Sequence, residues 1–282
     1  MNASPMPAPT QQGWSARLNL AFAARHTATI LAVNRHSGPL RLQRPLYPEG
    51  TGVCHACILH PPGGVVGGDR LTVEVTVGDG ANALVTTPGA TKFYRSNGAR
   101  ASQRQRFTVA DDASLEWFPQ DNIFYPGTEA VTETRIELAA GARFIGWEVQ
   151  CLGLPAAGAE FRAGRLSAGL KLFRSGRPLL LDRLEVSPNY GLHRPTGLRG
   201  QPVTAVFLAT GADREMLAPL RALLPAPSAR LTAAVTLMDD LLVARCIGES
   251  TFEARGWFQD LWSWLRPHLL GRSACPPRIW ST

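Results

Sequence analysis

The densest group of side chains that could bind a metal lies in residues 54–60. Cys54, His55 and Cys57 are followed by His60, and thiolate and imidazole groups suit zinc or nickel. The same stretch has the composition of a β-strand, in which alternate side chains face opposite ways, so Cys54 and Cys57 would point apart. We favour two buried cysteines and a surface histidine, with metal binding kept as the alternative.

A glycine-rich turn follows directly. Residues 60–69 read HPPGGVVGGD, and four glycines within six residues permit positive φ angles and close approach of the backbone. The spacing matches neither a P-loop nor the dinucleotide-binding pattern. The residues after it alternate like a strand, whereas a phosphate site would be followed by a helix. We therefore assign the glycines to a structural turn and keep Asp69 as a candidate buried acid.

Acidic side chains inside apolar strands form the next group. Glu148 lies in the segment FIGWEVQC (residues 144–151), and Asp182 follows three leucines. A carboxylate is costly to bury unless it is paired or functional. For Asp182, an ion pair with an adjacent or facing arginine and a functional role are equally open.

The residues alone predict no catalytic centre. The sequence lacks the G-x-S-x-G and H-E-x-x-H motifs and any Cys/His set with catalytic spacing. The aromatic run WFPQDNIF (residues 117–124) is assigned to the core. The segment TKFYRS (residues 91–96) mixes aromatic and basic side chains and is assigned to an amphipathic strand.

The elements that must position these residues are mainly strands. Residues 71–77 (LTVEVTV) alternate cleanly, and 27 glycines and 22 prolines are typical of many turns. A strand–turn–strand pattern recurs around Ala81, Ala113 and Ala142, with spacings of 32 and 29 residues. Ordinary hairpins would look similar, but this period favours stacked layers. We predict a mainly β, stacked-strand, β-helix-like (solenoid) fold.

Helical patterning appears only in the C-terminal third. One helix is expected over residues 212–224, ended by Pro225, and a second from about Ser250 to Arg266, stopped or kinked by Pro267. Strands are expected between them, over residues 229–235 and 241–247. Residues 1–12 are expected to form a disordered tail, and residues 13–282 a single β-rich domain.

Composition narrows the class of protein. Lys and Arg number 29 against 22 Asp and Glu, a net charge of +7, and 45% hydrophobic residues suffice for a core. No segment is apolar and long enough to span a membrane, and the N-terminus lacks the features of a signal peptide. Five cysteines do not make a disulfide framework, so a cytoplasmic location is expected. The charge permits an acidic partner.

Four stretches resemble the urease accessory protein D family, also called H in some organisms. They are residues 60–71 (HPPGGVVGGDRL), 87–96 (TPGATKFYRS), 117–124 (WFPQDNIF) and 264–282 (WLRPHLLGRSACPPRIWST). Their order and spacing also fit, and the match spans about residues 14–282. One departure is that Gly153-Leu154-Pro155 and Gly158-Ala159-Glu160 stand where the family often has Gly-Arg before a Gly-Glu pair.

The resemblance implies a β-helix-like fold with a pair of helices and a non-enzymatic role in loading nickel into apo-urease. The protein would act as a scaffold between urease and accessory proteins F and G, with GTP bound by G and no cofactor held stably here. Nickel would pass through an internal polar tunnel. Matching the family's pattern, Asp69, Glu148 and Asp182 are the expected tunnel-lining residues.

The second expected helix has two possible roles. Its apolar stripe of Trp257, Leu261, Trp262 and Leu265 could cap the β stack or dock against accessory protein F. Trp264 cannot share a face with Trp262, so one of them should be exposed or at an interface. The alternative functions are a β-helical enzyme or binding protein for an acidic polymer, and a nucleic-acid binder. We expect neither a nucleic-acid nor a membrane partner.

Overall fold

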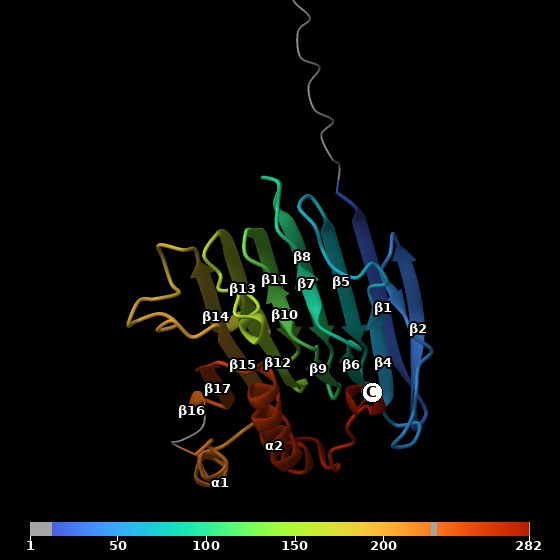
Figure 1. Cartoon of the computed structure of the whole chain (residues 1–282). Coiled ribbons are helices and arrows are strands. Elements are labelled where there is room, and N and C mark those ends of the chain that lie inside the picture. Colours follow the sequence, from blue (N-terminus) through green and yellow to red (C-terminus); the bar gives the residue numbers. More distant parts are fainter. Residues whose placement is uncertain (1–12, 227–229, 282) are drawn as a thin grey trace, which may run out of the picture.

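Two β-sheets face each other along most of the chain (Figure 1). The computed structural model describes residues 13–226 and 230–281, so the tail expected over residues 1–12 lies outside the described residues. In this described part, the first sheet has seven strands, in the spatial order β14 (Arg177–Val186), β13 (Gly164–Arg174), β11 (Thr128–Leu138), β8 (Ala101–Val109), β5 (Arg70–Val77), β1 (Ser15–Arg25) and β2 (Ala28–Ser37).

The second sheet has ten strands within the described residues. Its main order is β16 (Leu231–Met238), β17 (Leu241–Gly248), β15 (Val203–Thr210), β12 (Arg143–Leu152), β9 (Ser114–Phe118), β6 (Asn82–Thr86), β4 (Cys54–Leu59) and β3 (Arg41–Leu42). The short strand β10 (Asn122–Phe124) pairs with β12 and with β7 (Thr91–Phe93).

The chain winds from one sheet to the other and back, which makes the fold a β-solenoid. β5, β8 and β11 pair in parallel in the first sheet, and the strands that follow them, β6, β9 and β12, pair in parallel in the second. Ala81, Ala113 and Ala142 lie at the corners between the sheets and are 0%, 1% and 0% exposed. The repeat read from the sequence is therefore the stacking of solenoid layers, and the predicted fold class is confirmed.

Backbone hydrogen bonds hold successive corners together. The amide of Ser114 donates to the carbonyl of Ala81 at 3.0 Å, and the amide of Arg143 donates to the carbonyl of Ala113 at 2.9 Å. The buried alanines leave no space for a larger side chain at these corners. Gly80 has a φ of 67°, a left-handed conformation that glycine adopts without steric cost.

The two predicted helices are present, but their ends differ from the prediction. α1 covers only Leu217–Ala222, and α2 covers Thr251–Leu270, with 3₁₀ turns at Pro155–Ala157 (η1) and Arg278–Ser281 (η2). Ser250 caps the start of α2 because its hydroxyl accepts the amide of Glu253 at 3.3 Å.

Pro267 does not stop α2, which was one of the two effects expected of it. A proline in the last turn removes a single donor, and the amide of Gly271 still closes on the carbonyl of Pro267 at 3.1 Å. Gly271 then ends the helix in a left-handed conformation.

Two hydrophobic cores result from this arrangement. One fills the space between the sheets and includes Phe107 and Trp117, whose rings lie 4.9 Å apart. The other lies between the second sheet and α2, where the rings of Phe207 and Phe258 are 5.6 Å apart. The aromatic run of residues 117–124 contributes to both cores, as predicted. Among the described residues, no helix is both long and apolar enough to cross a membrane.

Candidate functional site

A stripe of polar side chains crosses the interior of the solenoid between the two sheets. We call Gln105, Thr134, Glu148, Asp182 and Arg245 the interior stripe. In the first sheet, Thr134 pairs in register with Gln105, and the same row continues through β13 to Asp182. In the second sheet, Glu148 and Arg245 each pair in register with the strand β15 that separates them. Register therefore aligns these residues across the strands, along the solenoid.

Hydrogen bonds connect the stripe from sheet to sheet. The hydroxyl of Thr134 lies 2.7 Å from Gln105 Oε1 and also contacts Glu148 Oε1. Gln150 Nε2 donates to the other carboxylate oxygen of Glu148 at 3.3 Å. Gln150 Oε1 is buried and has no hydrogen-bond partner among the described residues. Hydrogen bonds thus hold the carboxylate of Glu148 in place. Beside it, Gln150 Oε1 can still accept a hydrogen bond or bind a cation.

The cavities of the interior meet at Glu148. One of them, of about 470 Å³ and called here the large cavity, is lined by Glu148 and Gln150 and by Asp182 and Arg245. A smaller cavity of about 50 Å³ runs from Glu148 toward His60. Side chains of Asp182 and Arg245 are 31% and 47% exposed, so they lie at the mouth of the large cavity. This mouth is at the end of the solenoid formed by β14, β16 and β17 (Figure 1).

The environment of Glu148 favours its protonated form. Burial raises the pKa of its carboxyl from 4.5 to about 7, and the negative charge of Asp182 adds to this effect. Hydrogen bonds from Thr134 and Gln150 oppose the shift. Glu148 can therefore hold or release a proton near neutral pH, and its ionised form provides a negative charge at the inner end of the cavity.

Asp182 forms the ion pair that was one of its two expected roles. Arg245 Nη1 lies 2.6 Å from Asp182 Oδ2 and joins β17 of the second sheet to β14 of the first. Both residues remain partly exposed, so the pair is accessible from the mouth. Glu148 and Asp182 line one cavity.

Asp69 lies apart from these two acids. Its carboxylate oxygens accept the amides of Trp14 at 2.7 Å and Val66 at 2.9 Å, and the residue is 6% exposed. It therefore joins the start of β1 to the glycine-rich turn. Asp69 lines none of the cavities that meet at Glu148. The turn packs closely on a neighbouring segment, since a Cβ on Gly64 would lie 2.7 Å from the carbonyl oxygen of Lys92.

The cysteine- and histidine-rich segment forms β4. Cys54 and Cys57 are buried, as favoured, and burial raises the pKa of Cys57 to about 11, which disfavours the thiolate that a metal needs. The prediction of a surface histidine is wrong for His55, which is only 5% exposed. Its Nε2 lies 2.6 Å from Glu49 Oε1, so the buried ring has a polar partner. In the described part of the chain, no three His, Cys, Asp or Glu side chains are placed to hold a metal.

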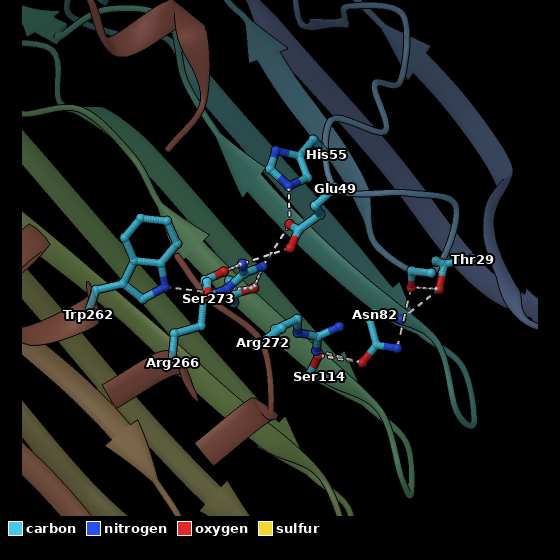
Figure 2. A network of polar contacts seen from close by, with 11 residues as sticks. Thr29, Glu49, His55, Asn82, Ser114, Trp262, Arg266, Arg272 and Ser273 are labelled. Carbon is cyan, nitrogen blue, oxygen red and sulfur yellow. Dashed lines mark hydrogen bonds and ion pairs between the residues drawn. The ribbon is translucent and has the colours of Figure 1, made fainter. Parts of the chain in front are cut away.

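A buried ion network that sequence reasoning missed connects α2 to the second sheet (Figure 2). Arg266 contacts the carboxylates of Glu49 at 2.7 Å and Glu116 at 2.9 Å. Burial disfavours the charged guanidinium, yet the two carboxylates outweigh this and raise the pKa of Arg266 above its usual value. An arginine one turn after Trp262, on the apolar side of an amphipathic helix, was the signal available in the sequence.

The network continues into the segment after α2. Arg272 Nη2 donates to Asn82 Oδ1 at 2.9 Å and to Ser114 Oγ at 2.7 Å (Figure 2). Trp280 Nε1 donates to Thr86 Oγ1 at 2.9 Å. These contacts attach the C-terminal segment to corner and strand residues of successive solenoid layers.

The apolar stripe of α2 packs against β12, β15 and β17 of the second sheet. Trp257 is 5% exposed, and Leu261, Trp262 and Leu265 are 0% exposed, so a partner cannot reach these four side chains directly. Trp264 is the more accessible tryptophan and stacks on His268 at 4.0 Å. Phe252, at the start of the helix, is 78% exposed. A partner that binds α2 would therefore meet its outer face.

Arginines and carboxylates also share a hollow of about 320 Å³ on the outer face of the first sheet. Arg104 and Arg106 line it together with Glu74 and Glu133. Lys171 neutralises Glu133 at 2.6 Å. Carboxylates clustered with arginines in an open hollow would suit a protein that acts on an acidic polymer, so the choice between the hypotheses depends on the relatives of the chain.

Comparison with known proteins makes that choice. The family model of the UreD urease accessory protein matches residues 15–281. Urease accessory protein UreD of Azoarcus sp. (strain BH72) is 46% identical over 273 residues, covering 96% of this chain and 95% of the relative. The protein of the same name from Alcanivorax borkumensis is 42% identical over 275 residues, covering 96% and 93%. The chain therefore belongs to the UreD urease accessory protein family, whose members are non-catalytic accessory proteins in urease maturation.

Proposed function

We propose that this protein is a scaffold and metallochaperone that passes nickel toward apo-urease along the interior stripe. It would work in the cytoplasm with accessory proteins F and G, and nickel would be its cargo, with no cofactor held stably. The observation that carries this proposal is that Glu148 and Asp182 line one cavity, from its inner side to its mouth.

The chemistry of the stripe suits a cation in transit. Carboxylate, amide and hydroxyl oxygens occur at intervals, and the imidazole of His60 lies on the small cavity that continues from Glu148. A path must bind a cation well enough to admit it and weakly enough to release it. Isolated oxygen ligands meet this requirement better than a closed site with several strong ligands.

Buried polar atoms without partners add support. Gln150 Oε1 in the large cavity and Trp117 Nε1 beside the smaller ones are buried and unpaired among the described residues. Such atoms are normally satisfied by water. An interior that holds water could replace part of the hydration shell of a passing cation.

The proposed location and partners rest on separate observations. All five cysteines are free thiols, which fits a reducing compartment. The proposed contact with accessory protein F would use the outer face of α2, where Phe252 is exposed and Trp264 partly so. Apo-urease and accessory protein G are proposed as partners on the basis of the family resemblance.

The test is the nickel content of urease produced together with its accessory proteins. Glu148→Gln and Asp182→Asn keep side-chain size and remove the negative charge. We expect each to lower the nickel bound per urease several-fold while the accessory complex still co-purifies. Glu137→Gln is the matched control, because this acid lies on β11 and pairs with Arg135 outside the interior stripe. Normal nickel loading by both acid variants would overturn the path.

A further inference from the structure

An arginine occupies an inward-facing position on β17, at the mouth of the proposed path. Arg245 pairs in register with Val206, and Val206 pairs with Glu148. Its neighbour two positions earlier, Val243, belongs to the core between the sheets. An arginine at such a position places a permanent positive charge on the same face as the acids, since guanidinium stays protonated in proteins.

The guanidinium of Arg245 forms an ion pair with the carboxylate of Asp182. A cation that enters or leaves the cavity through the mouth would meet this carboxylate. Arg245 Nη1 lies 2.6 Å from Asp182 Oδ2, and both side chains line the large cavity. The two residues come from facing sheets, so the pair bridges the open end of the solenoid. Glu148 lies further in on the same cavity and has no arginine or lysine partner among the described residues.

We propose that Arg245 is a gate, whose guanidinium acts as a tethered cation that occupies Asp182 and is displaced by a divalent cation. The gate rests on the proposed nickel path and adds a control element to it. Asp182 and Glu148 together would otherwise attract a divalent cation with no competing charge. The guanidinium competes for Asp182, so it keeps nickel from being held at the mouth.

The energetics suit a gate that opens easily. Exposed or half-exposed ion pairs contribute only about 0–1 kcal/mol, because water solvates both charges when the pair separates. Arg245 is 47% exposed, and its long side chain can move its charged end into solvent. A divalent cation has twice the charge of the guanidinium and can replace it on Asp182. The departing cation is in turn replaced by Arg245.

Nickel binding to the accessory complex without urease tests this gate. The full-length chain is purified with accessory proteins F and G, and binding of Ni²⁺ is measured by equilibrium dialysis. Nickel held by the other chains is common to all samples. We expect Arg245→Gln to bind nickel about three- to five-fold more tightly at Asp182, the size of effect that a weak competing ion pair produces. Arg245→Lys keeps the charge and should bind like the unchanged protein.

Two further variants make the result specific. The double variant Asp182→Asn/Arg245→Gln should lose the gain in nickel affinity expected of Arg245→Gln alone, because the carboxylate that binds the nickel is gone. Arg162→Gln, which breaks an exposed ion pair with Glu160 away from the cavity, should change nothing. Equal affinity in Arg245→Gln and the unchanged protein would overturn the gate, and so would tighter binding in both Arg245→Gln and Arg245→Lys.

Failure of the gate and failure of the path can be distinguished. If Arg245→Gln binds nickel normally while Glu148→Gln and Asp182→Asn lower the nickel content of urease, the gate is wrong and the path stands. If those two acid variants also load urease normally, the path itself is wrong.

Discussion

Arg266 of α2 and Glu116 of β9 form an ion pair with 0% and 1% of their side chains exposed. Arg266 Nε donates to Glu116 Oε1 at 2.9 Å, and Nη2 donates to Oε2 at 2.9 Å, so the contact is bidentate. Trp262 Nε1 adds a third donor at 2.7 Å. The pair joins residues far apart in the sequence and holds the C-terminal helix on the second sheet.

Removing one partner of this pair should be strongly destabilising. Arg266→Met would leave Glu116 and Glu49 without their cation, and breaking a buried pair costs about 3–5 kcal/mol. We expect the urea midpoint of unfolding to fall accordingly. Arg162→Gln, at an exposed ion pair with Glu160, is the control and should leave the midpoint unchanged. Equal stability of the two variants would show that the network does not hold α2 in place.

The stability of the protein should depend on pH through Glu148. Its pKa is about 7 in the folded state and near 4.5 in the unfolded chain. The unfolded state therefore loses this proton first as pH rises, and the contribution to stability is lost between about pH 4.5 and 7. The full shift corresponds to on the order of 3 kcal/mol, and to less if water in the cavity solvates the carboxylate.

Glu148→Gln measures this contribution. The amide of the variant does not titrate, whereas the unchanged protein must bury a charged carboxylate as pH rises, so the variant should gain stability relative to the unchanged protein between pH 4.5 and 7. The free energy of unfolding of both proteins is followed from pH 4.5 to 8. A difference that stays constant over this range would contradict the raised pKa.

Asp69 should matter for stability more than for nickel transfer. Asp69→Ala removes the acceptor of the Trp14 and Val66 amides, and leaving buried donors unpaired costs about 1–3 kcal/mol. Asp69→Asn keeps one acceptor and should cost less. Thermal unfolding measures both. At a temperature where Asp69→Asn is folded, it should load urease with nickel normally, and a loss as large as that of Asp182→Asn would place Asp69 on the path.

Gly146 should tolerate no side chain. A Cβ at this position would lie 2.8 Å from the carbonyl oxygen of Trp117 and 2.6 Å from Phe144 Cζ, both tighter than van der Waals contact. Gly146→Ala is therefore expected to destabilise the protein by about 1–3 kcal/mol. Gly169→Ala is the control, because nothing lies within 4 Å of the added atom. Urea unfolding of both variants makes the comparison, and an equal effect would refute the packing argument.

Local patterns in the sequence predicted much of the fold. Alternation identified the strands, and the spacing of Ala81, Ala113 and Ala142 indicated stacked layers, because each layer must place a small residue at its corner. The start of α2 was also predictable, since Ser250 is a local capping residue. Pro267 misled the prediction of the other end, because the number of hydrogen bonds that a proline removes depends on its place in the helix.

The sequence by itself determined the solenoid class, the stacked layers and the family, since these depend on periodicity and on motifs within short segments. Only the tertiary structure brought Glu148 and Asp182 to one cavity, separated Asp69 from them, and paired Arg266 with Glu116. The physical reason is that the energy of a buried charge depends on which residues surround it in space. Those neighbours come from strands and helices far apart in the chain, so a local sequence pattern does not predict them.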